Sequence, residues 1–63
     1  MKDSHVQLRF NNYIGHFYRR DKNDRWYKFH TIGNTGVAFD VAGLLIKMGC
    51  EVEFISKVED VDD

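Results

Sequence analysis

The sequence predicts an α+β fold, a small antiparallel sheet with one helix packed on one face, in the order β-β-β-α-β. Three observations lead to it. Apolar and polar residues alternate near the start of the chain, aromatic and β-branched residues dominate the next stretch, and apolar residues recur at helical spacing after Gly33. With 63 residues the chain suffices for one domain with a small core. We expect this domain to span residues 1–58, followed by an acidic tail at 59–63.

The first two strands are expected to form a hairpin. Residues 6–10 alternate between apolar and polar types, which is typical of a half-buried strand. Asn11-Asn12 follows, and asparagine tolerates the positive φ of a tight turn. A two-residue turn there would pair Val6 with Phe17 in a second strand over about residues 13–20.

The third strand is expected at about residues 25–32, after a turn at residues 21–24. The length of this loop decides which side chains share a face. An odd loop places Phe17 opposite Phe29, whereas an even loop would place it opposite Lys28, whose burial is costly. We therefore predict an odd loop, with Phe17, Tyr27 and Phe29 in the core.

The opposite, solvent-facing side of the sheet is then rich in cations and rings. Such a surface can stack single-stranded nucleic acid or form a protein-binding hot spot, although cross-strand pairs of this kind also simply stabilise a sheet. The candidate binding residues on this face are Arg9, His16, Tyr18, Arg20, Trp26, Lys28 and His30.

A helix is predicted over about residues 36–48, with Asn34 or Thr35 as N-cap and Gly49 just past its end. One apolar stripe should lie on the sheet. It comprises Val37, Val41, Leu44, Leu45 and Met48.

A second apolar flank of the same helix has no obvious cover in so small a protein. The termini, the sheet edge, a protein partner or a second copy of the chain are the candidates to cover it. The flank comprises Phe39, Ala42, Gly43 and Ile46.

The last strand is expected from Cys50 to about residue 58, with its glutamates in water. Cys50 has no cationic neighbour in sequence, so we interpret it as a small buried hydrophobic residue. The acidic tail is expected to be solvated. It could instead fold over the basic sheet face or dock on a basic partner.

Catalytic and metal-binding patterns are not evident. His5, His16, His30 and Cys50 lack the spacing of zinc ligands, and the acids outside the tail suggest no acid/base pair. The loop at 33–36 lacks the Gly-Lys-Ser/Thr ending of a phosphate loop. We therefore expect no enzyme activity, no cofactor and no metal.

Charge and cysteine content bear on the partner and the compartment. Residues 1–50 carry eight Lys/Arg against four Asp/Glu, while residues 51–63 carry one lysine against six acids. The net charge of −1 weakens a nucleic-acid interpretation. One cysteine, no signal-like segment and no membrane-length apolar run favour the cytoplasm and no membrane partner.

The layout resembles that of small phage regulators and of DNA-binding modules whose three strands read DNA while a helix packs behind. This resemblance concerns layout alone and no sequence motif. Two functions are therefore expected to compete. The first is a protein-binding regulatory module, such as a phage-type inhibitor of a host or defence factor, acting through the sheet face, the helix flank or both. The alternative is a nucleic-acid binder using the sheet face.

Overall fold

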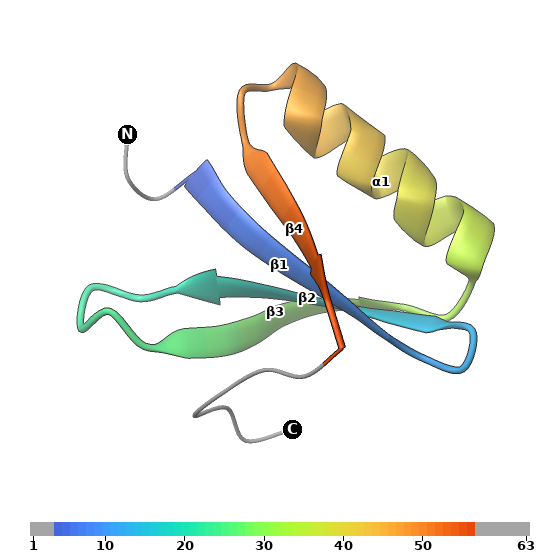
Figure 1. The fold of residues 1–63 in the computed structure, drawn as a ribbon, viewed down its shortest axis with the longest axis horizontal. Coiled ribbons are helices and arrows are strands. Elements are labelled where there is room, and N and C mark those ends of the chain that lie inside the picture. The colour runs from blue at the N-terminus through green and yellow to red at the C-terminus, as the bar shows by residue number, and fades with distance from the viewer. Residues whose placement is uncertain (1–3, 57–63) are drawn as a thin grey trace.

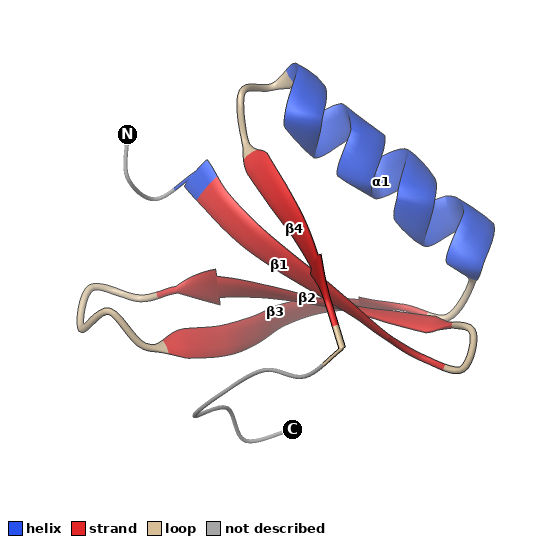
Figure 2. Cartoon of the chain, in the orientation of Figure 1, coloured by secondary structure: helices blue, strands red, loops and turns tan. Residues whose placement is uncertain are grey.

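The computed structural model describes residues 4–56. They form one sheet, in the strand order β3-β2-β1-β4, with a helix across one face (Figures 1 and 2). The α+β class and the order β-β-β-α-β are confirmed. The predicted tail and the end of the predicted last strand fall at 57–63, outside the described residues. The elements are β1 (His5–Asn11), β2 (Ile14–Arg20), β3 (Trp26–Ile32), α1 (Thr35–Lys47) and β4 (Glu51–Ile55).

The sheet is mixed, whereas an antiparallel sheet was expected. β1, β2 and β3 pair antiparallel, but β4 pairs parallel with β1. After β3, which is one edge of the sheet, α1 carries the chain to the other edge. A helical crossover of this kind is the connection that parallel strands require. β4 is therefore the second edge strand of the sheet and lies beside β1.

The first hairpin turns one residue later than predicted. Asn11 still belongs to β1 and pairs with Ile14, so the turn is Asn12-Tyr13, with Asn12 at φ 60°. Leu8 consequently lies opposite Phe17, a register shift of two residues from the prediction. Because side chains alternate with a period of two, this shift leaves every residue on its predicted face.

The loop between β2 and β3 has the predicted odd length, at residues 21–25. The Asp21 carboxylate accepts hydrogen bonds from the backbone N–H groups of Asn23 (2.8 Å) and Arg25 (3.1 Å). Asp24 adopts a left-handed φ of 65°. Asparagine and aspartate tolerate these turn positions better than most residues, so the loop sequence explains its conformation.

A β-bulge in β3 changes the pairing partway along the hairpin. Tyr18 pairs with Lys28, but the next residue of β2, Phe17, pairs with His30, which leaves Phe29 as the extra residue. The His30 ring stacks on Phe29 and lies 6.4 Å from the Phe17 ring. The bulge turns His30 to the side that bears α1, so its predicted place on the opposite side is wrong, although His30 is exposed there as predicted.

Both ends of α1 follow the predicted capping chemistry. The Asn34 side chain accepts a hydrogen bond from the Val37 backbone N–H at 3.0 Å. At the other end Gly49 adopts φ 97°, and its N–H bonds the Ile46 carbonyl while the Cys50 N–H bonds the Leu45 carbonyl. This pair of bonds is a Schellman motif, which needs a residue that tolerates the left-handed region.

The face that α1 presents to the sheet differs from the predicted stripe. Ala38 and Ala42 are buried at 0% and 3% exposure, so placing Ala42 on the open flank was wrong. A Cβ added to Gly15 would lie 2.8 Å from the Ala38 Cβ, so the helix and β2 approach closely. Only small side chains fit at this distance. Val41 and Leu45 pack at the border of the core, and the remaining members of the predicted stripe are exposed: Val37, Leu44 and Met48.

The core is smaller than predicted. Val6, Leu8 and Phe17 are buried, but Tyr27 and Phe29, also expected in the core, are 42% and 38% exposed. These two side chains are exposed because of where the helix begins. Thr35 Oγ1, at the start of α1, donates a hydrogen bond to the carbonyl oxygen of Tyr13 in the turn between β1 and β2. As Figure 1 shows, α1 therefore leaves the far end of the β2–β3 hairpin uncovered.

Candidate functional site

We define the outer face as the side of the sheet away from α1. Its side chains are less accessible than the sequence suggested. Tyr18 is completely buried, contrary to its predicted exposure. Arg9 donates to the Tyr18 hydroxyl from Nε (3.2 Å) and Nη2 (2.8 Å), and its guanidinium lies 5.8 Å from the ring centre. These two residues are therefore partners within the fold.

Trp26 is also held by neighbours on this face. The Arg20 guanidinium lies 5.2 Å from the centre of the indole and forms an ion pair of 3.1 Å with Asp24. The His5 ring meets the indole edge-on, with the ring centres 5.2 Å apart. Trp26 is half-buried as a result. The Arg20 and His5 contacts occupy part of the indole surface that a stacked base would need.

Three further residues were predicted on this face, and the structure places two of them there. His16 and Lys28 lie on the outer face and are half-buried. Thr31, opposite His16, takes the place that His30 was expected to fill. The structure thus places six of the seven predicted residues on one face: Arg9, His16, Tyr18, Arg20, Trp26 and Lys28. Two cation–ring pairs on this face, Arg9 with Tyr18 and Arg20 with Trp26, already contact each other.

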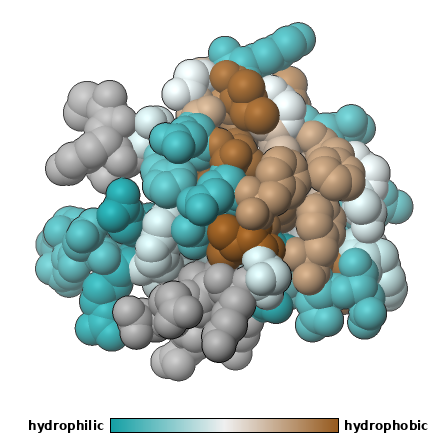
Figure 3. Space-filling model, viewed as in Figure 1, coloured by the Kyte–Doolittle hydropathy of each residue, from teal (hydrophilic) through white to brown (hydrophobic). Residues whose placement is uncertain are grey.

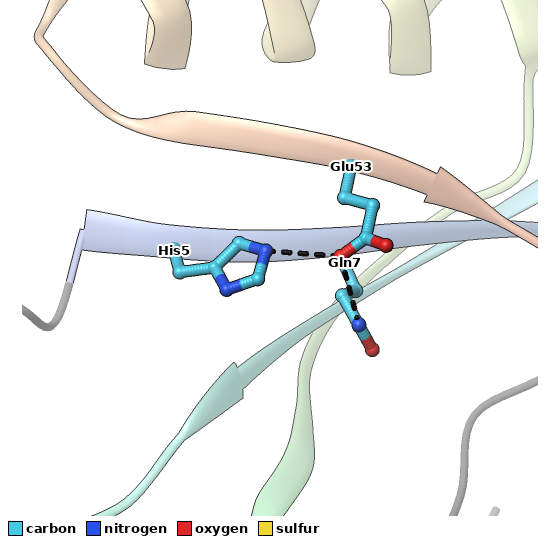
Figure 4. Close-up of polar contacts among 3 residues, drawn as sticks. All are labelled: His5, Gln7 and Glu53. Carbon is cyan, nitrogen blue, oxygen red and sulfur yellow. Dashed lines mark hydrogen bonds and ion pairs between the residues drawn. The ribbon is translucent and has the colours of Figure 1, made fainter.

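An acidic group from β4 joins this face, as Figure 4 shows. One oxygen of the Glu53 carboxylate, Oε1, lies 3.0 Å from His5 Nε2 and accepts a hydrogen bond of 3.1 Å from Gln7 Nε2. The hydrogen bond from Gln7 lowers the pKa of Glu53 below its ordinary value of 4.5, and His5 acts in the same direction. The expectation that Glu53 lies in water is confirmed, because the residue is exposed. Its position beside Gln7, which the sequence did not indicate, follows from the parallel pairing of β1 with β4.

The side of the molecule that bears α1 carries a contiguous apolar surface. Phe39 and Ile46, seven residues apart and on the same side of the helix, are 49% and 55% exposed. The Phe39 ring lies 5.2 Å from the Phe10 ring and 5.6 Å from the Phe54 ring. Phe54 is itself 53% exposed. We call Phe10, Phe39, Ile46 and Phe54 the aromatic flank.

The space-filling view shows this surface directly. Figure 3 displays a band of apolar side chains that runs across α1 and β4 on one face, with hydrophilic residues on both sides. Gly43, predicted to belong to the flank, is exposed, and an added Cβ would meet no atom within 4 Å. The structure therefore keeps Phe39, Gly43 and Ile46 on an open face and removes Ala42 from it.

Sequence reasoning missed the contribution of β4 to this surface. The alternation of β4 correctly indicated that Phe54 shares the side of Leu8, with which it pairs. It was expected to be covered there. The edge position of β4 decides otherwise, since Phe54 has a neighbouring strand on only one side.

Other kinds of site find little support in the part of the chain that the structure describes. Between residues 4 and 56 no three His, Cys, Asp or Glu side chains are grouped so that they could hold a metal ion. No helix in that range has the length and apolar character needed to cross a bilayer. Cys50 is half-buried, just before β4.

Comparisons of the chain with protein-family models, with curated proteins and with solved structures find no match.

Proposed function

We propose that this chain is a small protein-binding regulatory module and that its partner covers the aromatic flank. The observation that carries the proposal is the exposure, by about half, of three large apolar side chains on the side that bears α1, two of which are in ring contact: Phe39 (49%), Phe54 (53%) and Ile46 (55%). Contiguous apolar surface rimmed by polar residues is typical of a protein interface. A module of this size would act by occupying a surface of its target, as a small inhibitor does.

The free energy available at this patch is sufficient to matter. Full burial of a large apolar side chain is worth about 1.5–3 kcal/mol. Covering the exposed half of three such side chains would therefore contribute about 3 kcal/mol, which is more than a hundredfold in affinity. The three side chains belong to a helix and a strand, so their backbone is already ordered and binding has to order only the side chains.

The outer face supports the alternative, nucleic-acid binding, less well. In this alternative Arg9, Arg20 and Lys28 would contact phosphates, but Arg9 already donates to Tyr18 and Arg20 already pairs with Asp24. Trp26 already contacts the Arg20 guanidinium and the His5 imidazole. Protein binding is therefore the better-supported function, and with a single cysteine we propose a reducing, cytoplasmic setting.

The test is an affinity purification from a lysate of cells that carry the protein, with and without nuclease. The bait is compared with Phe39→Ser/Phe54→Thr, which removes both exposed rings of the flank. The matched control is Leu44→Ser, because Leu44 is 59% exposed on the other side of α1. Circular dichroism first establishes that all three baits are folded.

The expected result is a protein that survives nuclease, is retained by the Leu44→Ser bait and is lost from the double variant. A captured protein that disappears on nuclease treatment would favour the nucleic-acid alternative. Equal capture by all three baits would reject the aromatic flank as the binding surface.

A further inference from the structure

The two edges of the sheet differ in how well they are protected from pairing with another strand. β3, at one edge, carries the bulge at Phe29 and the charged Lys28. Bulges and lysines are common devices that prevent edge-to-edge association. β4, at the other edge, pairs with β1 in an uninterrupted register over Glu51–Ile55. Among residues 4–56 no strand pairs with β4 on its far side.

The two rows of side chains along β4 differ in chemistry. Phe54 faces the side that bears α1 and contacts Phe39 of the aromatic flank. Glu51 and Glu53 face the outer side, opposite His5 and Gln7 of β1. The two hydrogen bonds to Glu53 use one carboxylate oxygen, Oε1. A strand added beside β4 would therefore meet an apolar surface on one side and an acidic row on the other.

We infer that an extended segment of the partner protein adds to the edge of β4 as a fifth strand. This inference rests on the proposed function, which it makes more specific. Backbone hydrogen bonds to the five residues of β4 would supply affinity, and alternate side chains would supply specificity. Apolar side chains of the segment lie on the aromatic flank, and the intervening residues are Lys or Arg that face Glu51 and Glu53.

Charge argues against a second copy of this chain as the occupant. Antiparallel pairing of β4 with β4 of a copy related by two-fold symmetry would bring the row of Glu51 and Glu53 beside an identical acidic row. Like charges on neighbouring strands are destabilising. Pairing of β4 with β3 of another copy would be interrupted by the bulge at Phe29. A basic and apolar strand from a different protein meets neither obstacle.

Two peptides provide the probe. One is a capped seven-residue peptide of alternating valine and lysine, and the other has glutamate in place of lysine. Each is titrated into the isotope-labelled full chain while backbone amide shifts are recorded by NMR. The protein is compared with Glu51→Gln/Glu53→Gln, which removes the acidic row and leaves the aromatic flank intact.

The lysine peptide should bind at least about tenfold more tightly than the glutamate peptide, because two favourable charge pairs replace two unfavourable ones. The amide shifts that the lysine peptide causes should map to β4 and Phe39. In the Gln variant the two peptides should bind with about equal affinity. Equal affinities, shifts on β3, or a preference that persists in the Gln variant would overturn the inference. Sedimentation showing a dimer whose contact maps to β4 would do so as well.

The two proposals fail in different ways. If the affinity purification yields a partner that depends on Phe39 and Phe54 while the peptides do not discriminate, the partner binds the aromatic flank without adding a strand. If no captured protein depends on these rings, the proposed function itself is wrong.

Discussion

The closest approach between α1 and the sheet allows a quantitative test of the fold. Gly15 lies beneath Ala38, and a Cβ built on it would stand 2.8 Å from the Ala38 Cβ. Two carbon atoms in contact are ordinarily about 3.5–4.0 Å apart. Gly15→Ala therefore requires α1 to move away from β2 by roughly 0.7 Å or more. Its φ is not positive, so an alanine there is hindered by its neighbours rather than by its own backbone.

The expected loss of stability follows from two opposing terms. Overpacking of this kind costs about 1–3 kcal/mol. Replacing a glycine within a strand returns about 0.5–1 kcal/mol, since the unfolded chain loses freedom. The difference between these terms spans about 0–2.5 kcal/mol. Because the added Cβ would also lie 3.3 Å from Phe10 and 3.4 Å from Leu8, we expect the upper part of this range, a fall in the free energy of unfolding of about 1–2 kcal/mol, which is a large part of the few kcal/mol available to a domain of this size.

Urea unfolding followed by fluorescence of the single tryptophan, Trp26, measures this loss. With an m value of about 1 kcal/mol/M the midpoint should fall by about 1–2 M. Gly43→Ala is the matched control, because no atom lies within 4 Å of the added Cβ. It should raise the stability by up to about 1 kcal/mol, the difference in helix propensity.

A double-mutant cycle isolates the contact. Ala38→Gly alone loses helix propensity and a buried methyl, but it also removes the atom that the Gly15→Ala methyl would strike. The double variant should therefore be about 1–2 kcal/mol more stable than the sum of the two single losses predicts. Additive losses, or a Gly15→Ala protein as stable as the original, would refute the close packing of α1 on β2.

Three further predictions concern the core, the helix cap and the Glu53 carboxylate with its partners Gln7 and His5. Phe17→Ala should cost about 3–5 kcal/mol and leave the domain unfolded by circular dichroism, whereas Phe29→Ala, 38% exposed, should cost less than about 2 kcal/mol and stay folded. Asn34→Ala should cost about 1 kcal/mol and lower Tm by about 4–8 °C, and an unchanged Tm would contradict its role as N-cap. The pKa of Glu53 is lowered, chiefly by the hydrogen bond from Gln7, so the stabilisation that its carboxylate provides is present above pH 4.5 and is lost as the pH falls through the lowered pKa. In Glu53→Gln the urea midpoint should therefore change less with pH over that acidic range than in the original protein. An equal pH dependence of the two midpoints would contradict the role of the Gln7–Glu53 hydrogen bond.

The local features of the fold could be read from the sequence because short-range chemistry decides them. Alternation identified the strands, the odd loop at 21–25 was predicted from the cost of burying Lys28, and Asn34 and Gly49 were identified as cap residues. The candidate sites were predicted less well. The aromatic flank was found only in part, since Phe54 is exposed through the edge position of β4, which no local pattern specifies.

The sequence by itself determined the kind and order of the elements and, through the two-residue period of a strand, the face of most side chains. The tertiary structure alone decided the parallel pairing of β4, the bulge at Phe29 and the rotation of α1 that buries Ala38 and Ala42. Periodicity fixes the direction of a side chain relative to its own backbone. Whether that side chain is covered depends on which distant segment packs over it, and this depends on close approach at positions such as Gly15.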